Sequence, residues 1–185
     1  MQFQKIVLSL QLKKLSLTNK IKIMNIALVA HDGRKKELLE WVRYNAEKLF
    51  KHRLFATGTT GKLIQDMFKE EDDTFDNEEE KTHYYDYKIT RLLSGPLGGD
   101  QQIGAMIAEG KIDVLIFFCD NLITQGHQQD VGALSRLASL YNIPFATNRT
   151  TADMILTSTL FDNLEYQRII PKSIENYAKR NLQKG

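Results

Sequence analysis

Four short segments of the chain combine histidine, aspartate or hydroxyl side chains with small residues. In chain order these segments contain His31 and Asp32, then residues 57–61, then residues 94–96 leading to Asp100, and finally Asp120 leading to His127 and Asp130. Each segment follows a short apolar run. Histidine and carboxylate side chains exchange protons with a substrate when burial and neighbouring charges adjust their pKa values. The segments therefore predict acid–base chemistry, provided that the fold brings them together.

The segment TGTTG at residues 57–61 has the composition of an anion-binding turn. Its glycines let backbone amides point inward, and the helix expected after it would favour negative charge at its N-terminus. Further donors are the hydroxyls of Thr57, Thr59 and Thr60, and a fixed positive charge could come from Lys35. The Walker A spacing is absent, which favours a phosphate monoester over a nucleoside triphosphate. The alternative is a tight turn with capping threonines and a solvated lysine.

The segment SGPLGGDQQ at residues 94–102 carries a second unusual loop. Three glycines and a proline ahead of a helix predict a tightly shaped loop that a simple connection would not need. Asp100 falls at the expected start of the helix, so helix capping is one interpretation of this residue. The other is a general base whose pKa is adjusted by burial and by neighbours.

Two pairs of ionisable residues could complete such a site. His127 and Asp130 share a polar segment and could supply an acid or an electrophile. His31 and Asp32 could form a second pair across the same crevice. The spacing of these histidines and carboxylates matches no common metal-ligand pattern, so the sequence predicts no metal site.

The elements that must position these residues alternate between short apolar runs and helical patterns. Strands are predicted at residues 26–30, 53–56, 89–93, 112–118 and 144–147. Helices are predicted from the residues after Gly33 to Leu49, from near Lys62, over 101–110, 131–141 and 151–158, and at the end of a tail over 166–182. This rhythm predicts a single-domain α/β fold, a doubly wound open parallel sheet of about five strands with helices on both faces. Ligands bind outside the carboxyl ends of such strands, which is where the four polar segments fall.

Length and composition limit the classes of protein that fit. The chain has 185 residues, 42% hydrophobic content and a formal net charge of +2, so charge points to neither nucleic acid nor a membrane as partner. Its single cysteine, Cys119, excludes an internal disulfide and suits a reducing compartment such as the cytoplasm.

The domain is expected to span residues 24–185. Residues 1–23 are either an N-terminal extension or precede the natural start at Met24, and they read poorly as a signal peptide. Residues 70–88 are rich in aspartate and glutamate and are expected to form an exposed acidic insertion.

Six motifs together resemble those of the methylglyoxal synthase family in order and spacing. They are VAHDGRK at 29–35, ATGTTG at 56–61, SGPLGGDQQ at 94–102, EGKIDVLIFF at 109–118, the segment 127–130, and IPFATNRTTAD at 143–153. The resemblance implies the fold of that family. It also implies a lyase that converts dihydroxyacetone phosphate to methylglyoxal and inorganic phosphate without metal or organic cofactor. A homohexamer inhibited by phosphate is implied as well.

The resemblance also implies roles for individual residues. Asp100 would be the base that removes a proton next to the carbonyl, His127 would hydrogen-bond the substrate oxygens, and Asp130 would share in the proton transfers. His31 would line the site. The phosphate would be held by Lys35, Thr57, Gly58, Thr59, Thr60, Ser94 and Gly95, with support from Asp32, Asp120 and Arg180. Two stretches depart from the family pattern, the segment NLITQG at 121–126 and the pair Gln128-Gln129. These departures bear on the rigidity of the loop and on how its surroundings adjust the chemistry of His127.

Two other classes of function compete with this one. The same fold serves as a regulatory domain that binds effectors without catalysis, and such a domain would keep the phosphate-binding loops but need neither Asp100 nor His127. A structural or partner-binding module would leave four polar strand ends unexplained. The joint presence of Asp100 and His127 favours the enzyme.

Overall fold

A computed structural model describes residues 21–72, 89–122 and 128–182. Within these residues, five parallel strands form one sheet in the order β3-β2-β1-β4-β5. The strands are β1 (Asn25–Ala30), β2 (Arg53–Ala56), β3 (Ile89–Arg91), β4 (Val114–Phe118) and β5 (Phe145–Ala146). The predicted doubly wound parallel sheet is thereby confirmed, and its strand order reverses direction between β1 and β4.

The central strand β1 is apolar and buried from Ile26 to Ala30 because both faces of the sheet are covered. Ile26 and Leu28 belong to one hydrophobic core, while Ala27 and Val29 belong to the core on the other face. Successive side chains of a strand point to opposite faces, so a strand buried on both faces cannot show polar alternation.

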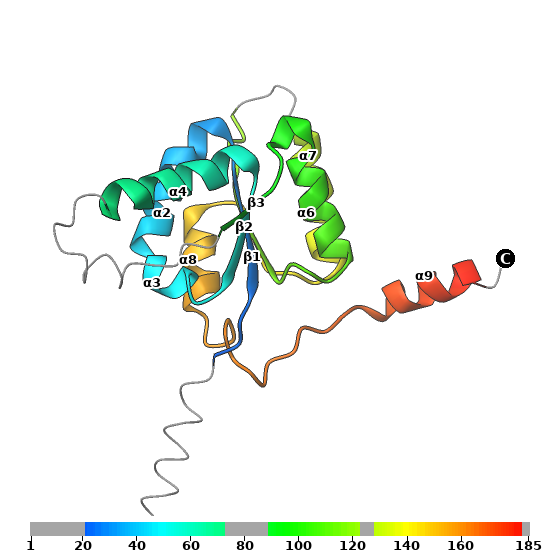
Figure 1. Cartoon of the computed structure of the whole chain (residues 1–185). Helices are drawn as coiled ribbons and strands as arrows, with labels where there is room; N and C mark the ends of the chain where they lie inside the picture. Colours follow the sequence, from blue (N-terminus) through cyan, green and yellow to red (C-terminus); the bar gives the residue numbers. More distant parts are fainter. Residues whose placement is uncertain (1–20, 73–88, 123–127, 183–185) are drawn as a thin grey trace, which may run out of the picture.

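Helices cover the two faces of the sheet as separate groups (Figure 1). One face carries α2 (Lys35–Tyr44), α3 (Ala46–Leu49), α4 (Gly58–Asp72) and α8 (Arg149–Thr157). The other carries α6 (Gly99–Ala108) and α7 (Gln128–Leu140). Trp41 of α2 anchors the first core, with its ring centroid 5.9 Å from that of Phe118 on β4. Short 3₁₀ turns, η1 (Asp32–Arg34) and η2 (Gly95–Leu97), follow β1 and β3.

Several boundaries differ from the sequence-based expectation. The helix expected to run on to Leu49 breaks at Asn45, whose side-chain amide donates to the carbonyl of Trp41 at 2.9 Å. Helix α4 begins at Gly58 rather than near Lys62. Its first turn closes through the amide of Gly61, which donates to the carbonyl of Thr57 at 2.8 Å. The TGTTG segment at residues 57–61, called the threonine turn from here on, is therefore the first turn of the helix itself.

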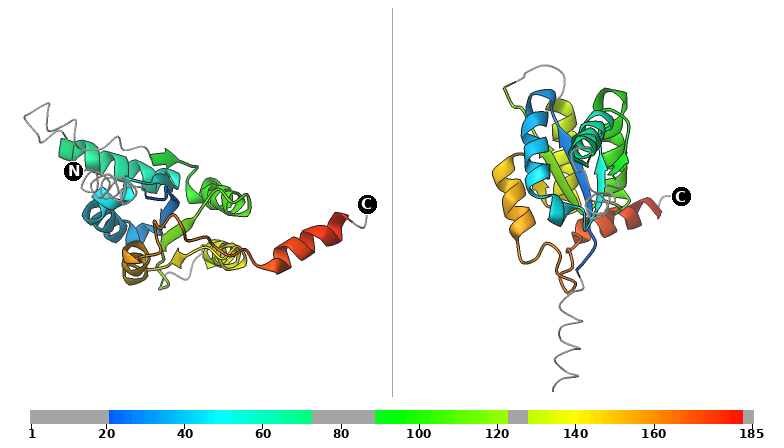
Figure 2. Two further views of the ribbon diagram at one scale, coloured as in Figure 1. Left: turned by 90° about the horizontal axis from the view of Figure 1, so that it is seen from below. Right: turned by 60° about the vertical axis from the view of Figure 1, so that its left-hand side comes forward.

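The C-terminal segment leaves the body of the domain. After α8 the chain crosses beneath the amino ends of the strands, and α9 (Lys172–Leu182) then projects away from the sheet (Figures 1 and 2). None of the helices in the described part of the chain has the length and apolar content needed to cross a bilayer. The predicted acidic insertion begins inside α4, which continues to Asp72, and its remainder lies outside the described residues, as do residues 1–20 of the extension.

Candidate active site

A cavity of about 540 Å³ opens at the carboxyl ends of the strands, beside the reversal between β1 and β4. Residues from all four predicted segments meet there. The sequence-predicted residues that line it are His31, Asp32, Lys35, Thr57, Thr59, Thr60, Ser94, Gly95, Asp100, Asp120 and Asp130. The convergence expected from the strand ends therefore occurs in one cavity.

Asp100 is the second residue of α6 and only 7% exposed. The N-cap of the helix is Gly98, which has a left-handed φ of 98°, so Asp100 is not the capping residue. Its Oδ1 atom is buried and accepts no hydrogen bond from the described residues. A buried acceptor left open at a cavity is costly for folding and is therefore a candidate contact for a ligand.

Burial raises the pKa of the Asp100 carboxyl above its ordinary value, and the nearby carboxyl of Asp130 raises the pKa further. The backbone amides of Asp100 and Gln101 act in the opposite sense but do not overcome these effects. A carboxylate with a raised pKa holds a proton more strongly and is a better general base than a solvated one.

The threonine turn presents hydroxyls and a helix N-terminus to the same cavity. Thr57 and Thr60 are buried, and the Thr57 hydroxyl donates to that of Thr60 at 3.2 Å. The N-terminus of α4 carries partial positive charge, which attracts an anion. The Lys35 ammonium lies 2.5 Å from Asp32 Oδ1 at the cavity wall, where Lys35 is mostly buried and Asp32 is exposed.

The backbone of Leu93 joins the threonine turn to the helix of Asp100. Its carbonyl accepts the amide of Gly58 at 2.9 Å, and its amide donates to Gln102 Oε1 at 2.8 Å. At Gly99, an added Cβ would lie 1.9 Å from the Leu93 carbonyl oxygen. Gly58 itself lies outside the cavity lining, and an added Cβ there would lie 2.9 Å from both the Leu92 oxygen and the Ser94 nitrogen. These glycines permit the first turn of α4 and the start of α6 to approach the backbone of residues 92–94 closely.

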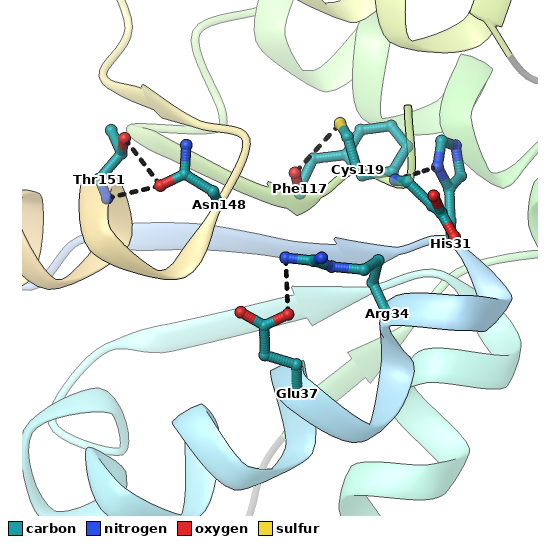
Figure 3. Close-up of polar contacts among 8 residues, drawn as sticks. His31, Arg34, Glu37, Phe117, Cys119, Asn148 and Thr151 are labelled. Carbon is teal, nitrogen blue, oxygen red and sulfur yellow. Dashed lines mark hydrogen bonds and ion pairs between the residues drawn. The ribbon is translucent and has the colours of Figure 1, made fainter. Parts of the chain in front are cut away.

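The imidazole of His31 is held in one orientation (Figure 3). The backbone amide of Asp120 donates to His31 Nδ1 at 2.8 Å, and the ring meets Phe117 edge-on at 5.0 Å. Because Nδ1 accepts this hydrogen bond, the neutral ring carries its proton on Nε2. His31 is thereby suited to donate a hydrogen bond.

Besides Gly58, two other predicted residues are not among those that line this cavity. Arg180 belongs to α9, which projects away from the sheet (Figure 2). His127 lies outside the described residues, so its predicted role stays a prediction. Among the described residues, no group of three or more His, Cys, Asp or Glu side chains could hold a metal ion.

Sequence reasoning did not name Val29, Ala30 and Pro96, which also line the cavity, and it missed two residues with a clearer part in the site. Phe117 lines the cavity from within the apolar run of β4, where nothing distinguishes it from a core residue. Gln102 anchors Leu93, and its only signal was its place at the end of the motif SGPLGGDQQ.

Comparisons with known proteins agree with this site. Residues 37–147 match the family model described as MGS-like domain. The chain is 50% identical over 158 residues to a methylglyoxal synthase of Proteus mirabilis, covering 85% of this chain and 91% of that one. It is 51% identical over 162 residues to a methylglyoxal synthase of Maridesulfovibrio salexigens, covering 87% and 99%.

A solved structure gives the same result for the fold. The crystal structure of methylglyoxal synthase from Elizabethkingia anophelis is 44% identical in sequence and superposes with a TM-score of 0.68, covering 86% of this chain and 94% of the other. The family match, the identity over most of the chain and the convergent cavity together show that the chain belongs to the methylglyoxal synthase family.

Proposed function

We propose that this chain is a carbon–oxygen lyase, a methylglyoxal synthase that converts dihydroxyacetone phosphate to methylglyoxal and inorganic phosphate. The observation that carries this proposal is the buried carboxyl of Asp100, which shares a cavity with the N-terminal turn of α4. A base and an anion-binding turn in one cavity suit a phosphorylated substrate with an acidic carbon–hydrogen bond. An effector-binding domain without catalysis would not need the buried base.

The phosphate group would bind at the N-terminus of α4. Thr59, Thr60 and Ser94 line that part of the cavity and carry hydroxyl donors, with Gly95 beside them. Thr57 braces the turn through its bond to Thr60, and Gly58 lets the turn approach Leu93. The ammonium of Lys35 supplies a full positive charge, and its salt bridge to exposed Asp32 orients it.

Asp100 would take a proton from the hydroxymethyl carbon next to the carbonyl. The electron pair of that carbon–hydrogen bond forms the double bond of an enediolate, and negative charge develops on the former carbonyl oxygen. Donors placed in advance stabilise this charge, and the Nε2–H of His31 is suited to the task. His127 is proposed as the principal donor to the substrate oxygens, with Asp130 and Asp120 supporting the proton transfers.

Phosphate would leave in the next step. The enediolate electrons expel the phosphate from the remaining carbon, its carbon–oxygen bond breaks, and the resulting enol takes up a proton on carbon to give methylglyoxal. Expulsion requires this bond to stand perpendicular to the enediolate plane. Hydrogen bonds to Leu93 fix the position of the threonine turn (residues 57–61) relative to Asp100. A phosphate held by this turn would keep one orientation relative to the enediolate plane, which would favour elimination over isomerisation.

The direct test is an assay of the purified full-length protein with dihydroxyacetone phosphate in the presence of a chelator. Methylglyoxal and inorganic phosphate should appear in equal amounts, and the chelator should have no effect. Absence of both products would contradict the lyase, and loss of activity with chelator would contradict a reaction without metal.

We also propose that the enzyme works as a homo-oligomer in the cytoplasm, a hexamer by family resemblance, with inorganic phosphate as both product and inhibitor. The supporting observation is α9, whose Tyr177 is exposed on a helix that projects from the body (Figure 1). Arg180 on this helix would reach an active-site region only through a second copy of the chain.

A further inference from the structure

A second cavity, of about 290 Å³, lies at the amino ends of the strands, opposite the candidate active site. It is a partly open cavity that lies between the starts of β1, β4 and β5 and the segment that crosses beneath them after α8. Its apolar surface comes from Met24, Val114, Ile143 and Phe161. The proposed reaction uses none of these residues.

Arg168 also lines this cavity, and its positively charged guanidinium makes few hydrogen bonds. Its side chain is 20% exposed. The NH1 group lies 3.4 Å from the carbonyl of Ile112 and 4.0 Å from Asp113 Oδ1, both long contacts. The Nε atom is buried and makes no hydrogen bond within residues 21–72, 89–122 and 128–182. A buried guanidinium N–H without an acceptor is unfavourable, because guanidinium groups normally satisfy their donors.

The charged residues that line the cavity leave it with a net positive charge. The Asp113 carboxylate pairs with Arg168 only at 4.0 Å, and its Oδ2 also accepts the backbone amide of Asn25 at 2.9 Å. Lys22, a second cation in the lining, donates to the carbonyl of Tyr166 at 3.1 Å. Two cations therefore face one carboxylate, and the cavity favours an anion.

We propose that this cavity binds a small amphipathic anion. A planar apolar body would pack between Met24, Ile143 and Phe161, and one anionic oxygen would bind the guanidinium of Arg168, which lines the cavity and is 20% exposed. The proposal is independent of Asp100 and of the lyase activity, since β1 and β4 separate this cavity from the other one.

The test uses 2-naphthoate, a fluorescent aromatic carboxylate, titrated into the full-length protein. We expect saturable binding with one site per chain and much weaker binding of the neutral 2-naphthamide. Arg168→Met should weaken 2-naphthoate binding about tenfold or more, because a hydrogen bond to a charged group is lost. Inorganic phosphate should not displace 2-naphthoate, since phosphate is expected at the opposite edge of the sheet.

Two variants separate this site from a folding defect and from the other cavity. Leu160→Trp adds bulk at a half-exposed position of the lining, leaves Arg168 in place and should also weaken binding. Thr59→Val alters only the other cavity and should leave binding unchanged. Absence of saturable binding, wild-type affinity in both Arg168→Met and Leu160→Trp, or displacement by phosphate would overturn the proposal.

Discussion

Burial has two opposite effects on the carboxyl of Asp100. It makes the carboxylate a stronger base, and it also makes the charged form less favourable, so that a larger fraction is protonated at a given pH. The active form is the carboxylate, so kcat/KM should fall as the pH drops through the raised pKa of Asp100. Asp130→Asn removes the neighbouring carboxyl that raises this pKa and should move the acid limb of the profile to lower pH. A profile unchanged in Asp130→Asn would contradict the coupling of the two carboxyls.

His52 gives a second pH-dependent property, this time of stability. The side chain is buried, its Nδ1 accepts the amide of Met24 at 3.3 Å, and burial lowers its pKa below 6.5. The unfolded chain therefore binds a proton more readily than the folded one. The contribution of neutral His52 is fully present above pH 6.5 and is lost as the pH falls through the folded pKa.

The free energy of unfolding, measured by urea titration at several pH values, checks this contribution. Wild type should lose stability as the pH falls below 6.5, and His52→Leu should show a smaller loss over the same range. The same pH dependence in both proteins would assign the effect to other groups.

The first residues of α6 pack closely against the backbone of Leu93, and this contact positions Asp100. Gly99→Ala would place a Cβ 1.9 Å from the backbone oxygen of Leu93, so the loop or the helix must shift. We expect a destabilisation of about 1–3 kcal/mol and a large fall in kcat. The matched control is Gly132→Ala in α7, where an added Cβ meets nothing within 4 Å and should stabilise the helix by up to about 1 kcal/mol. Equal stability of both variants would contradict this role of Gly99.

The elements could be predicted from sequence more completely than the contacts between them. Apolar runs such as β4 (Val114–Phe118) are distinctive because they are buried on both faces. Helix α4 begins at Gly58, earlier than the sequence predicts, because a segment of threonine and glycine is also typical of a loop. The role of Gly99 depends on a backbone oxygen six residues earlier, and the anchoring by Gln102 spans nine residues. Neither contact leaves a local pattern in the sequence.

The molecule consists of an α/β body and a C-terminal helix, α9, that projects from it. Several large apolar side chains are exposed along this tail, and a group of this kind is typical of an interaction surface; they are Leu164, Tyr166, Ile169, Ile170 and Tyr177. The proposed assembly through α9 predicts that a chain ending at Pro171 has the mass of a monomer in size-exclusion chromatography with light scattering, whereas Arg180→Ala keeps the mass of an oligomer. A monomeric wild-type protein, or an unchanged mass after truncation, would contradict assembly through α9.

The proposed lyase reaction depends on Asp100 acting as the base in the cavity at the carboxyl ends of the strands. The most direct test compares methylglyoxal formation from dihydroxyacetone phosphate by wild type and by Asp100→Asn, which keeps the shape of the side chain and removes its basicity. We predict that kcat falls about 10²-fold or more, because general base catalysis contributes roughly 10²–10⁴-fold. Melting temperatures should show that the variant is folded. Turnover by Asp100→Asn close to that of wild type would contradict the account.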